Sequence, residues 1–137
     1  MNDSADSKCV LIIDDEKAIA DSLAAIFKQQ GFDAHAAYSA EQALDLVDRL
    51  QPALAILDVV LPRMNGIDLA ILLKAEFPAC EIVLISGQFV TETLVQQAAR
   101  QGHDFYVYPK PFPPQALLAK ARELLSREAP AQSFSSL

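Results

Sequence analysis

Apolar and polar residues follow one another along the chain in blocks that predict five strands. Five short apolar runs have the length of strands and cover residues 9–13, 32–36, 53–57, 81–85 and 105–108. The first, third and fourth runs are almost continuously apolar, which is typical of strands buried on both faces of a parallel sheet. The second run alternates more, so we expect it nearer an edge of that sheet.

The segments between these runs have the period of helices, and their ends carry helix signals. Gly31 follows the first such segment as a stop signal, and Ser39 with Gln42 forms a capping-box pattern at the start of the second. In "PRMNG" we expect Asn65 to cap the third helix and Gly66 to adopt a positive φ. Strand–helix alternation repeated five times predicts an α/β fold, a doubly wound parallel sheet with helices on both faces.

Composition narrows the class of protein. The chain has 137 residues, 52% of them hydrophobic, and a formal net charge of −7. We expect one domain over residues 8–127, between flexible segments 1–7 and 128–137. An acidic surface argues against direct binding of nucleic acid, and no apolar run is long enough to span a membrane. The polar start of the chain lacks the features of a signal peptide, so we expect a cytoplasmic protein.

The cysteines and histidines give no metal motif in the sequence. Cys9 and Cys80 are far apart and lie in or beside apolar runs, so we expect reduced, packed thiols. His35 and His103 have no cysteine or carboxylate partner at the usual zinc-ligand spacing, and we therefore expect no zinc site.

Polar side chains capable of binding a metal or a phosphate follow four of the five predicted strands. They are Asp14 and Asp15, Asp58, Ser86, and Lys110. Ligands of open α/β sheets bind at the carboxyl ends of the strands, so these side chains should meet in one crevice. Read alone, the acid pair is more typical of a helix cap, and Ser86 of a plain turn. Their convergence favours a functional site.

Three converging carboxylates repel one another unless a cation neutralises them. Mg²⁺ prefers oxygen ligands and keeps waters that a phosphate group can replace. Lys110 and Ser86 supply a positive charge and a hydroxyl for the outer phosphoryl oxygens, and an aspartate can act as the nucleophile. These groups together fit aspartyl-phosphate chemistry.

Four stretches in this order resemble the response-regulator receiver domains of two-component signalling, the CheY-like family. They are "LIIDDE", "ILDVVLPRMNGIDL", "VLISG" and "YPKPF", and the resemblance covers roughly residues 8–126. It implies that the domain over residues 8–127 is a receiver domain, with a flavodoxin-like sheet in the strand order 2-1-3-4-5.

The resemblance also implies the role of each site residue. Asp58 would be the phosphoacceptor, and Mg²⁺, or Mn²⁺ in its place, would bind to Asp15 directly and to Asp14 through water. Asp58 itself and the backbone carbonyl of Val60 would complete the protein ligands. Ser86 and Lys110 would contact the phosphoryl group, with a cis bond between Lys110 and Pro111.

By the same resemblance, the partners would be a sensor histidine kinase or a phosphotransfer protein and an unidentified downstream protein. We expect a stand-alone phosphorelay protein, a monomer or weak dimer, that catalyses only its own phosphorylation and slow autodephosphorylation.

The sequence departs from the family pattern near its fifth strand. The family usually carries an aromatic switch residue three positions before the lysine, where this chain has Val107. Counting forward from Gly102 gives Tyr106 instead, and Tyr108 is also near. Either the preceding loop contains one extra residue, which we favour, or a bulge turns a tyrosine into place.

Two other classes of protein compete with this interpretation. One is an interaction module that keeps the fold without being phosphorylated. The other is an enzyme acting on an external substrate, such as a haloacid-dehalogenase-like phosphatase or a flavodoxin. The adjacent acids Asp14 and Asp15 and the absence of a Ser/Thr/Gly-rich loop after the first strand disfavour the enzyme.

Overall fold

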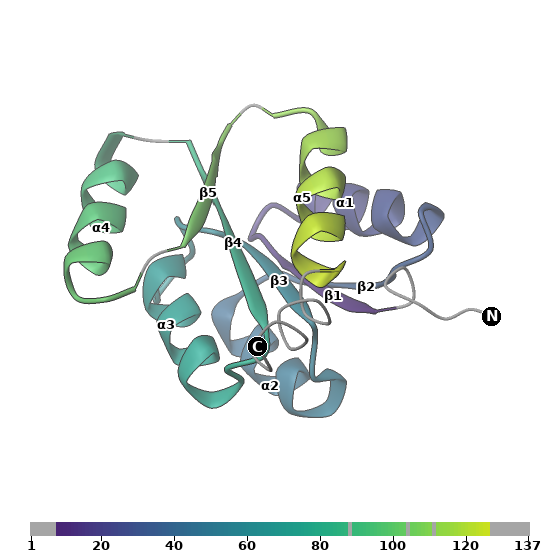
Figure 1. The fold of residues 1–137 in the computed structure, drawn as a ribbon, viewed down its shortest axis with the longest axis horizontal. Helices are drawn as coiled ribbons and strands as arrows, with labels where there is room; N and C mark the ends of the chain where they lie inside the picture. Colours follow the sequence, from purple (N-terminus) through teal and green to yellow (C-terminus); the bar gives the residue numbers. More distant parts are fainter. Residues whose placement is uncertain (1–7, 88, 104, 111, 127–137) are drawn as a thin grey trace, which may run out of the picture.

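A computed structural model describes residues 8–87, 89–103, 105–110 and 112–126, with the backbone alone for 89–94. Strands and helices alternate strictly along the chain (Figure 1). The elements are β1 (Cys9–Ile13), α1 (Lys17–Gln29), β2 (Asp33–Ala37), α2 (Ala40–Leu50), β3 (Leu54–Asp58), α3 (Gly66–Glu76), β4 (Glu81–Ser86), α4 (Phe89–Arg100), β5 (Tyr106–Pro109) and α5 (Pro114–Ser126). No helix within the described residues is both long and apolar enough to cross a membrane.

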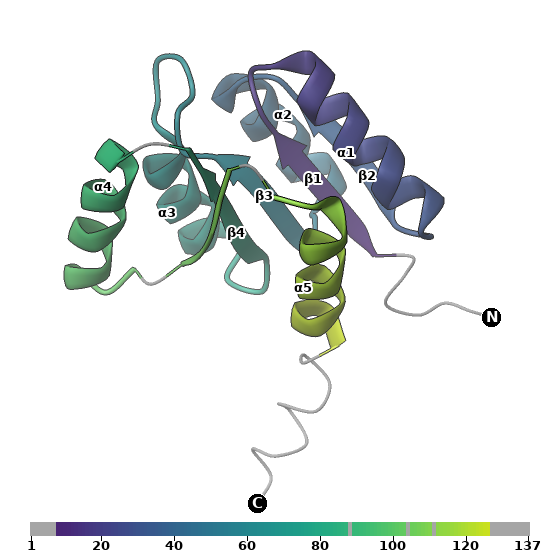
Figure 2. The same cartoon turned by 90° about the horizontal axis from the view of Figure 1, so that it is seen from above.

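The five strands form one parallel sheet in the order β2-β1-β3-β4-β5. This order confirms the predicted doubly wound architecture, and it places β2 at an edge as expected. Since all strands run the same way, their carboxyl ends lie together at one end of the sheet, called the carboxyl edge below (Figure 2). Their amino ends lie together at the opposite end, the amino edge.

Four strands differ by one residue from the apolar runs that predict them. β3 includes Asp58 and β4 includes Ser86, so these two residues end their strands instead of following them. The reason is strand pairing, because Asp58 pairs with Ile85 and Ser86 with Pro109 in register with the preceding residues. β2 and β5 likewise begin and end one residue later than expected.

The sheet separates two hydrophobic cores. Val10 and Ile12 of β1 pack on the side covered by α1 and α5, whereas Leu11 and Ile13 pack on the side covered by α2, α3 and α4. Alternation along a strand sends successive side chains to opposite faces, so a nearly continuous apolar run fills both cores. All four of these β1 side chains are buried.

The helix starts follow the predicted capping chemistry. The backbone N–H of Gln42 donates to Ser39 Oγ at 3.1 Å at the start of α2. The side chain of Gln42 reaches back one residue further than a standard capping box does and accepts from the N–H of Tyr38 at 2.8 Å. Asn65 caps α3 by accepting from the N–H of Asp68 at 2.8 Å. Gly31, with a φ of 99°, follows α1 as expected.

The expected positive φ at Gly66 is wrong. The residue of this turn in the left-handed region is Arg63, with a φ of 70°. Gly66 is needed for a different reason: a Cβ at this position would lie 2.1 Å from the carbonyl oxygen of Asp58. The N–H of Gly66 also donates to the carbonyl of Val59 at 2.6 Å, so the start of α3 packs directly on the end of β3.

Several predictions concern residues outside the described part of the chain. They are the flexible segments 1–7 and 128–137 and the cis bond to Pro111.

Candidate functional site

Asp14 is the most buried acid of the candidate site. It follows β1 directly, only 1% of its surface is exposed, and its N–H donates to the carbonyl of Ala37 at 3.1 Å. Its Oδ1 accepts from the N–H of Glu16 at 2.9 Å, whereas its Oδ2 is buried without a hydrogen-bond partner. A buried carboxylate oxygen without a partner is costly, so this atom is a candidate ligand for a cation.

Asp58 lies at the end of β3 and is 6% exposed. Its two oxygens have different partners. Oδ1 accepts from the N–H of Val60 at 2.9 Å, and Oδ2 accepts from Lys110 Nζ at 2.8 Å. The side chain of Val60 itself points away from the core and is 57% exposed. The turn after β3 therefore fixes one oxygen of Asp58 through the backbone and leaves the other to a cation.

Lys110 reaches the site from the far end of the sequence. Its backbone N–H donates to the carbonyl of Ser86 at 2.7 Å, which continues the pairing of β4 with β5. A Cβ at Gly87 would lie 3.4 Å from Lys110 Cδ, so the lysine chain passes close over this glycine. The lysine Nζ lies 4.0 Å from Asp14 Oδ2 as well, too far for a hydrogen bond but within range of charge attraction.

The structure brings together the three acids that the sequence predicts to converge. Carboxylate oxygens of Asp14, Asp15 and Asp58 lie within 4.8 Å of one another, with Asp15 exposed at the rim. Ser86 is at the end of the neighbouring strand, tied to Lys110 through its carbonyl. All of the predicted site residues therefore lie at the carboxyl edge of the sheet.

Burial and the close approach of the acids shift the pKa values of two groups in the site, Asp14 and Lys110. Burial raises the pKa of Asp14, and the negative charge of Asp58 raises it further against the opposing effects of the Glu16 N–H and of Lys110. Burial by itself would lower the pKa of Lys110, but its hydrogen bond to Asp58 and the nearby negative charges outweigh burial and raise it. The site therefore carries an excess of negative charge that a single lysine balances only in part.

A hard divalent cation fits this donor set. Every candidate ligand is an oxygen atom, two of the three acids are buried, and Asp14 Oδ2 has no hydrogen-bond partner. Mg²⁺ prefers such ligands and tolerates a site with only a few protein oxygens. Helix capping explains less, because Glu16 stands at the N-cap of α1 and its side chain makes no capping hydrogen bond.

The pairing of β5 with β4 is regular and contains no bulge that could turn a tyrosine into the position of Val107. Residues Tyr106 to Pro109 pair one for one with Val83 to Ser86, so the additional residue relative to the family pattern lies before the strand. Val107 packs against the core under α3 and α4, Tyr108 packs against the opposite core, and Tyr106 is exposed. The favoured interpretation, with an aliphatic residue at this position, agrees with the register.

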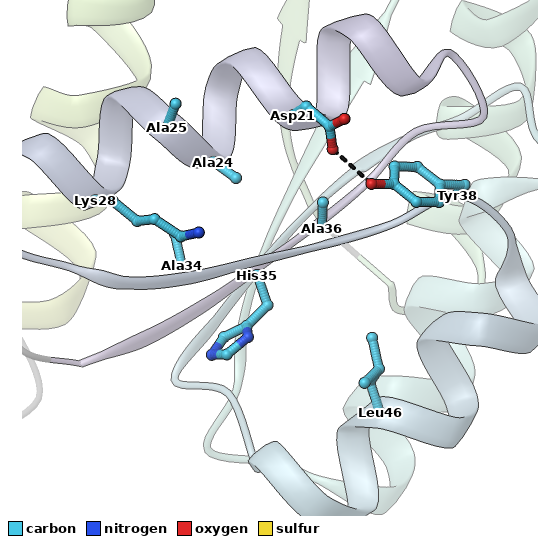
Figure 3. A pocket seen from close by; sticks show the side chains of 9 residues that line it. All are labelled: Asp21, Ala24, Ala25, Lys28, Ala34, His35, Ala36, Tyr38 and Leu46. Carbon is cyan, nitrogen blue, oxygen red and sulfur yellow. Dashed lines mark hydrogen bonds between the residues drawn. The ribbon is translucent and has the colours of Figure 1, made fainter.

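A pocket of about 390 Å³ lies away from these acids, at the edge of the sheet along β2 (Figure 3). Its lining includes Lys28 of α1, Leu46 of α2, and Tyr38, whose hydroxyl donates to Asp21 at 2.6 Å. None of the acids at the carboxyl edge lines it, nor does Lys110. This pocket is therefore separate from the group of acids at the carboxyl edge.

A second group of side chains with metal-ligand atoms close together is not evident from the sequence. Cys9, Asp33 and His35 each present a ligand atom within 4.8 Å of the others, at the amino end of the sheet. His35 has no cysteine or carboxylate at the usual zinc-ligand spacing in the sequence, but the pairing of β1 with β2 brings Cys9 and Asp33 close to it. Alternation along each strand is the available signal, but it becomes useful only once the register is known. Cys9 and Cys80 form no disulfide within the described residues, which agrees with the expected reduced thiols.

Comparison with known proteins identifies the family. The sequence profile of the response regulator receiver domain matches residues 10–122. The DNA-binding response regulator MtrA of Mycolicibacterium smegmatis is 36% identical over 128 residues, which are 92% of this chain and 55% of that protein. The response regulator MprA of a Mycobacterium species is 32% identical over 88% of this chain and 52% of its own length. The chain thus spans about half the length of the curated relatives it matches.

Solved structures agree. A CheY-like receiver domain protein from Methanospirillum hungatei superposes with a TM-score of 0.82 at 26% identity, over 91% of this chain and 98% of the other. NtrX from Brucella abortus gives a TM-score of 0.81 at 29% identity, over 94% of this chain and 29% of its own. With its five-stranded parallel sheet, and with Asp14, Asp58 and Lys110 in contact range at the carboxyl edge, this chain belongs to the response regulator receiver domain family of two-component systems.

Proposed function

We propose that Asp58 accepts a phosphoryl group from a phosphohistidine of a histidine kinase or phosphotransfer protein. The observation that carries the proposal is the contact of Asp58 Oδ2 with Lys110 Nζ at 2.8 Å, beside the buried and unpartnered Oδ2 of Asp14. A nucleophilic carboxylate thus lies next to one fixed positive charge and next to a second buried carboxylate that a cation would neutralise.

In the proposed reaction an oxygen of Asp58 attacks phosphorus in line with the phosphohistidine bond. The phosphorus–nitrogen bond breaks, the histidine keeps the electron pair, and an aspartyl phosphate forms. Lys110 changes partner from Asp58 to a phosphoryl oxygen, where its charge stabilises the developing negative charge. The backbone N–H of Val60 keeps the carboxyl group oriented through the step.

Asp14, Asp15, Asp58 and the carbonyl of Val60 would hold Mg²⁺ in this scheme. When bound, the cation supplies charge neutralisation between the acids and the incoming phosphoryl oxygens. The fit rests on the oxygen-only donor set and on the unpartnered oxygen of Asp14.

After transfer, the hydroxyl of Ser86 donates to a phosphoryl oxygen in our proposal. Ser86 pairs with Pro109 and its carbonyl accepts from the N–H of Lys110, so a shift at Ser86 also acts on β5. We propose that a downstream protein reads the change on the face that includes β5, where Tyr106 is 37% exposed and its ring centre lies 4.1 Å from Lys120 Nζ.

Intact-mass measurement after incubation with acetyl phosphate and Mg²⁺ tests the proposal. Wild type should gain the mass of one phosphoryl group, and Asp58→Asn should gain none. Asp33→Asn makes the same chemical change at an exposed acid at the other end of the sheet, and it should be phosphorylated like wild type. A wild-type protein that gains no mass would instead support the phosphorylation-independent interaction module.

A further inference from the structure

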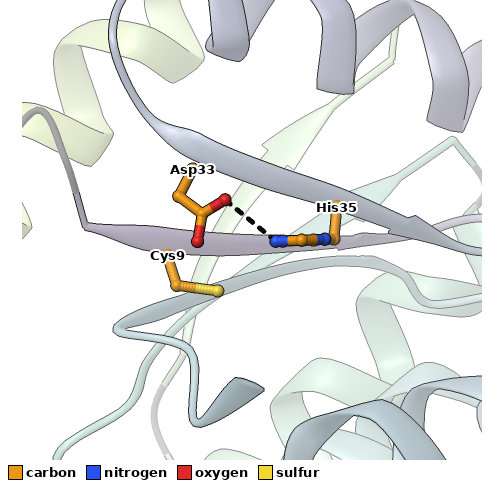
Figure 4. Close-up of side chains that lie close together, drawn as sticks. All are labelled: Cys9, Asp33 and His35. Carbon is orange, nitrogen blue, oxygen red and sulfur yellow. Dashed lines mark hydrogen bonds and ion pairs between the residues drawn. The ribbon is translucent and has the colours of Figure 1, made fainter. Parts of the chain in front are cut away.

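The amino end of the sheet carries a group of side chains that the receiver chemistry does not use. Figure 4 shows Cys9 of β1 beside Asp33 and His35 of β2, with His35 Nε2 at 3.0 Å from Asp33 Oδ1. Cys9 and His35 are partly buried and Asp33 is exposed. The group therefore lies at the surface, accessible to an ion from solution.

The sheet itself holds these three residues together. Cys9 pairs with Asp33 and Leu11 with His35, so the thiol and the carboxylate lie on adjacent strands at the same level. Odd-numbered residues of β1 and β2, such as Leu11 and Ala37, face the core under α2 and α3. By alternation Cys9, Asp33 and His35 share that face, where the row of side chains passes from the core to solvent.

The distances suit one small metal ion. In a tetrahedral zinc site, ligand atoms at usual bond lengths lie about 3.4–3.6 Å from one another. Here each pair of ligand atoms lies within 4.8 Å, and the imidazole and carboxylate are already 3.0 Å apart. The widest pair of ligand atoms therefore exceeds the tetrahedral separation by at most about 1.4 Å, and the side chains have to close this gap on binding.

We propose that Cys9, Asp33 and His35 form a binding site for a thiophilic divalent cation, with Zn²⁺ as the preferred ion. The donor set is one sulfur, one imidazole nitrogen and one carboxylate oxygen, which selects Zn²⁺ over Mg²⁺. Three protein ligands leave the fourth tetrahedral position open to water or to a ligand from another molecule.

A cation bound here would neutralise the Asp33 carboxylate and take the place of the Cys9 thiol proton. Burial and the charge of Asp33 raise the pKa of that thiol to about 11, so the cation has to displace a proton from the sulfur at neutral pH. The acids at the carboxyl edge offer oxygen alone, so the two ends of the sheet differ in the metal that they favour.

The test uses the reduced full chain titrated with Zn²⁺ and with Co²⁺ in an excess of Mg²⁺. Competition with a chromogenic chelator should give one tightly bound Zn²⁺ per chain. Co²⁺ should give a thiolate-to-metal charge-transfer band together with the intense visible bands of four-coordinate cobalt. Bound Zn²⁺ should also raise the melting temperature of the wild type.

Variants assign the ligands. Cys9→Ser should abolish the charge-transfer band, and each of Cys9→Ser, His35→Gln and Asp33→Asn should weaken Zn²⁺ binding by at least about tenfold. Cys80→Ser and His103→Gln are matched controls that should keep both the band and the affinity. Asp58→Asn should keep them too, which separates this site from the acids at the carboxyl edge.

Three results would overturn the proposal. One is the absence of stoichiometric Zn²⁺ binding by correctly folded wild type, checked by circular dichroism. Another is a charge-transfer band that survives Cys9→Ser or disappears in Cys80→Ser. The third is unchanged affinity in any one of the three ligand variants, because the remaining two residues would not make the site described.

Discussion

The groups of side chains at the two ends of the same parallel sheet are brought together in different ways. At the carboxyl edge, buried acids from β1 and β3 meet a lysine that follows β5, so distant parts of the sequence share one charged group of side chains. At the amino edge, Cys9, Asp33 and His35 come from two adjacent strands and lie partly in solvent. The first group depends on burial and long-range topology, and the second on strand register alone.

The difference in burial between the two ends of the sheet determines how strongly a charged side chain there affects folding stability. Asp14 and Asp58 are almost fully buried, so each unit of charge there changes the stability of the fold as well as its chemistry. Asp33 is exposed, and water screens its charge. The same substitution should therefore have unequal effects at the two ends.

Of the substitutions predicted here, Lys110→Met should have the largest effect, a loss of phosphorylation rate. This change removes the positive charge beside Asp58 while keeping most of the side-chain volume, and the rate of phosphorylation by acetyl phosphate should fall by about 100-fold. Lys28→Met, at an exposed position of α1, is the matched control and should leave the rate unchanged. Rates are read from intact mass against time. Equal rates in the two variants would show that the short contact with Asp58 has no role in the reaction.

Gly66→Ala should have the second-largest effect, a loss of folding stability, although it alters no charged group. The new methyl carbon would meet the carbonyl of Asp58 at 2.1 Å, so α3 or the end of β3 must move. Overpacking of this kind costs about 1–3 kcal/mol of unfolding free energy. Gly87→Ala, where the nearest atom is a flexible lysine carbon at 3.4 Å, is the comparison and should cost less. Urea denaturation of both variants measures the difference, and equal losses would contradict it.

Asp14→Asn should stabilise the protein in the absence of divalent cations, by about 1 kcal/mol at neutral pH. The folded state raises the pKa of Asp14, so folding favours its protonated form, and wild type loses stability as the pH rises through the range from the ordinary to the raised pKa. The advantage of the variant should therefore shrink as the pH falls toward the ordinary pKa of aspartate. Urea denaturation in EDTA at several pH values checks this, and a destabilised variant at neutral pH would refute it.

The smallest effect should come from Asp33→Asn, the same chemical change at the amino edge. Without added metal, the unfolding free energy should change by no more than about 0.5 kcal/mol, since the carboxylate is exposed and its partner His35 is accessible to water. Measured beside Asp14→Asn under identical conditions, it gives the direct contrast between the two ends. A loss as large as the gain at Asp14 would remove that contrast.

The sequence predicts the carboxyl edge better than the amino edge for a physical reason. The end of each strand can be recognised within its own segment, and parallel strands end at a common edge, so local patterns place Asp14, Asp58 and Lys110 at the same end of the sheet. The strand order, which the family resemblance implies, then brings them together. The grouping of Cys9 with His35 depends on the pairing of β1 with β2. A shift of one residue in that pairing would turn the side chains to opposite faces, and no local pattern fixes it.

Gly66 is a single-residue example of a feature that the local sequence indicates without giving its physical cause. Its place in a turn is evident from the neighbouring residues, but whether the turn needs a free φ or a missing Cβ depends on the distance to the carbonyl of Asp58. The extra residue before β5 is likewise visible in the sequence. Its location is fixed only by the pairing of Tyr106 with Val83.

Strand β1 connects Cys9 at the amino end of the sheet with Asp14 at the carboxyl edge, and it therefore fixes the distance between the two groups of side chains. It is paired on both sides, with β2 and with β3; Cys9 begins it and Asp14 follows it directly. Five residue steps of a strand span roughly 16 Å. A paramagnetic Co²⁺ ion at the proposed Cys9 site would thus be a fixed magnetic reference, against which nuclear relaxation would measure any movement of the loops around Asp58 on the proposed phosphorylation.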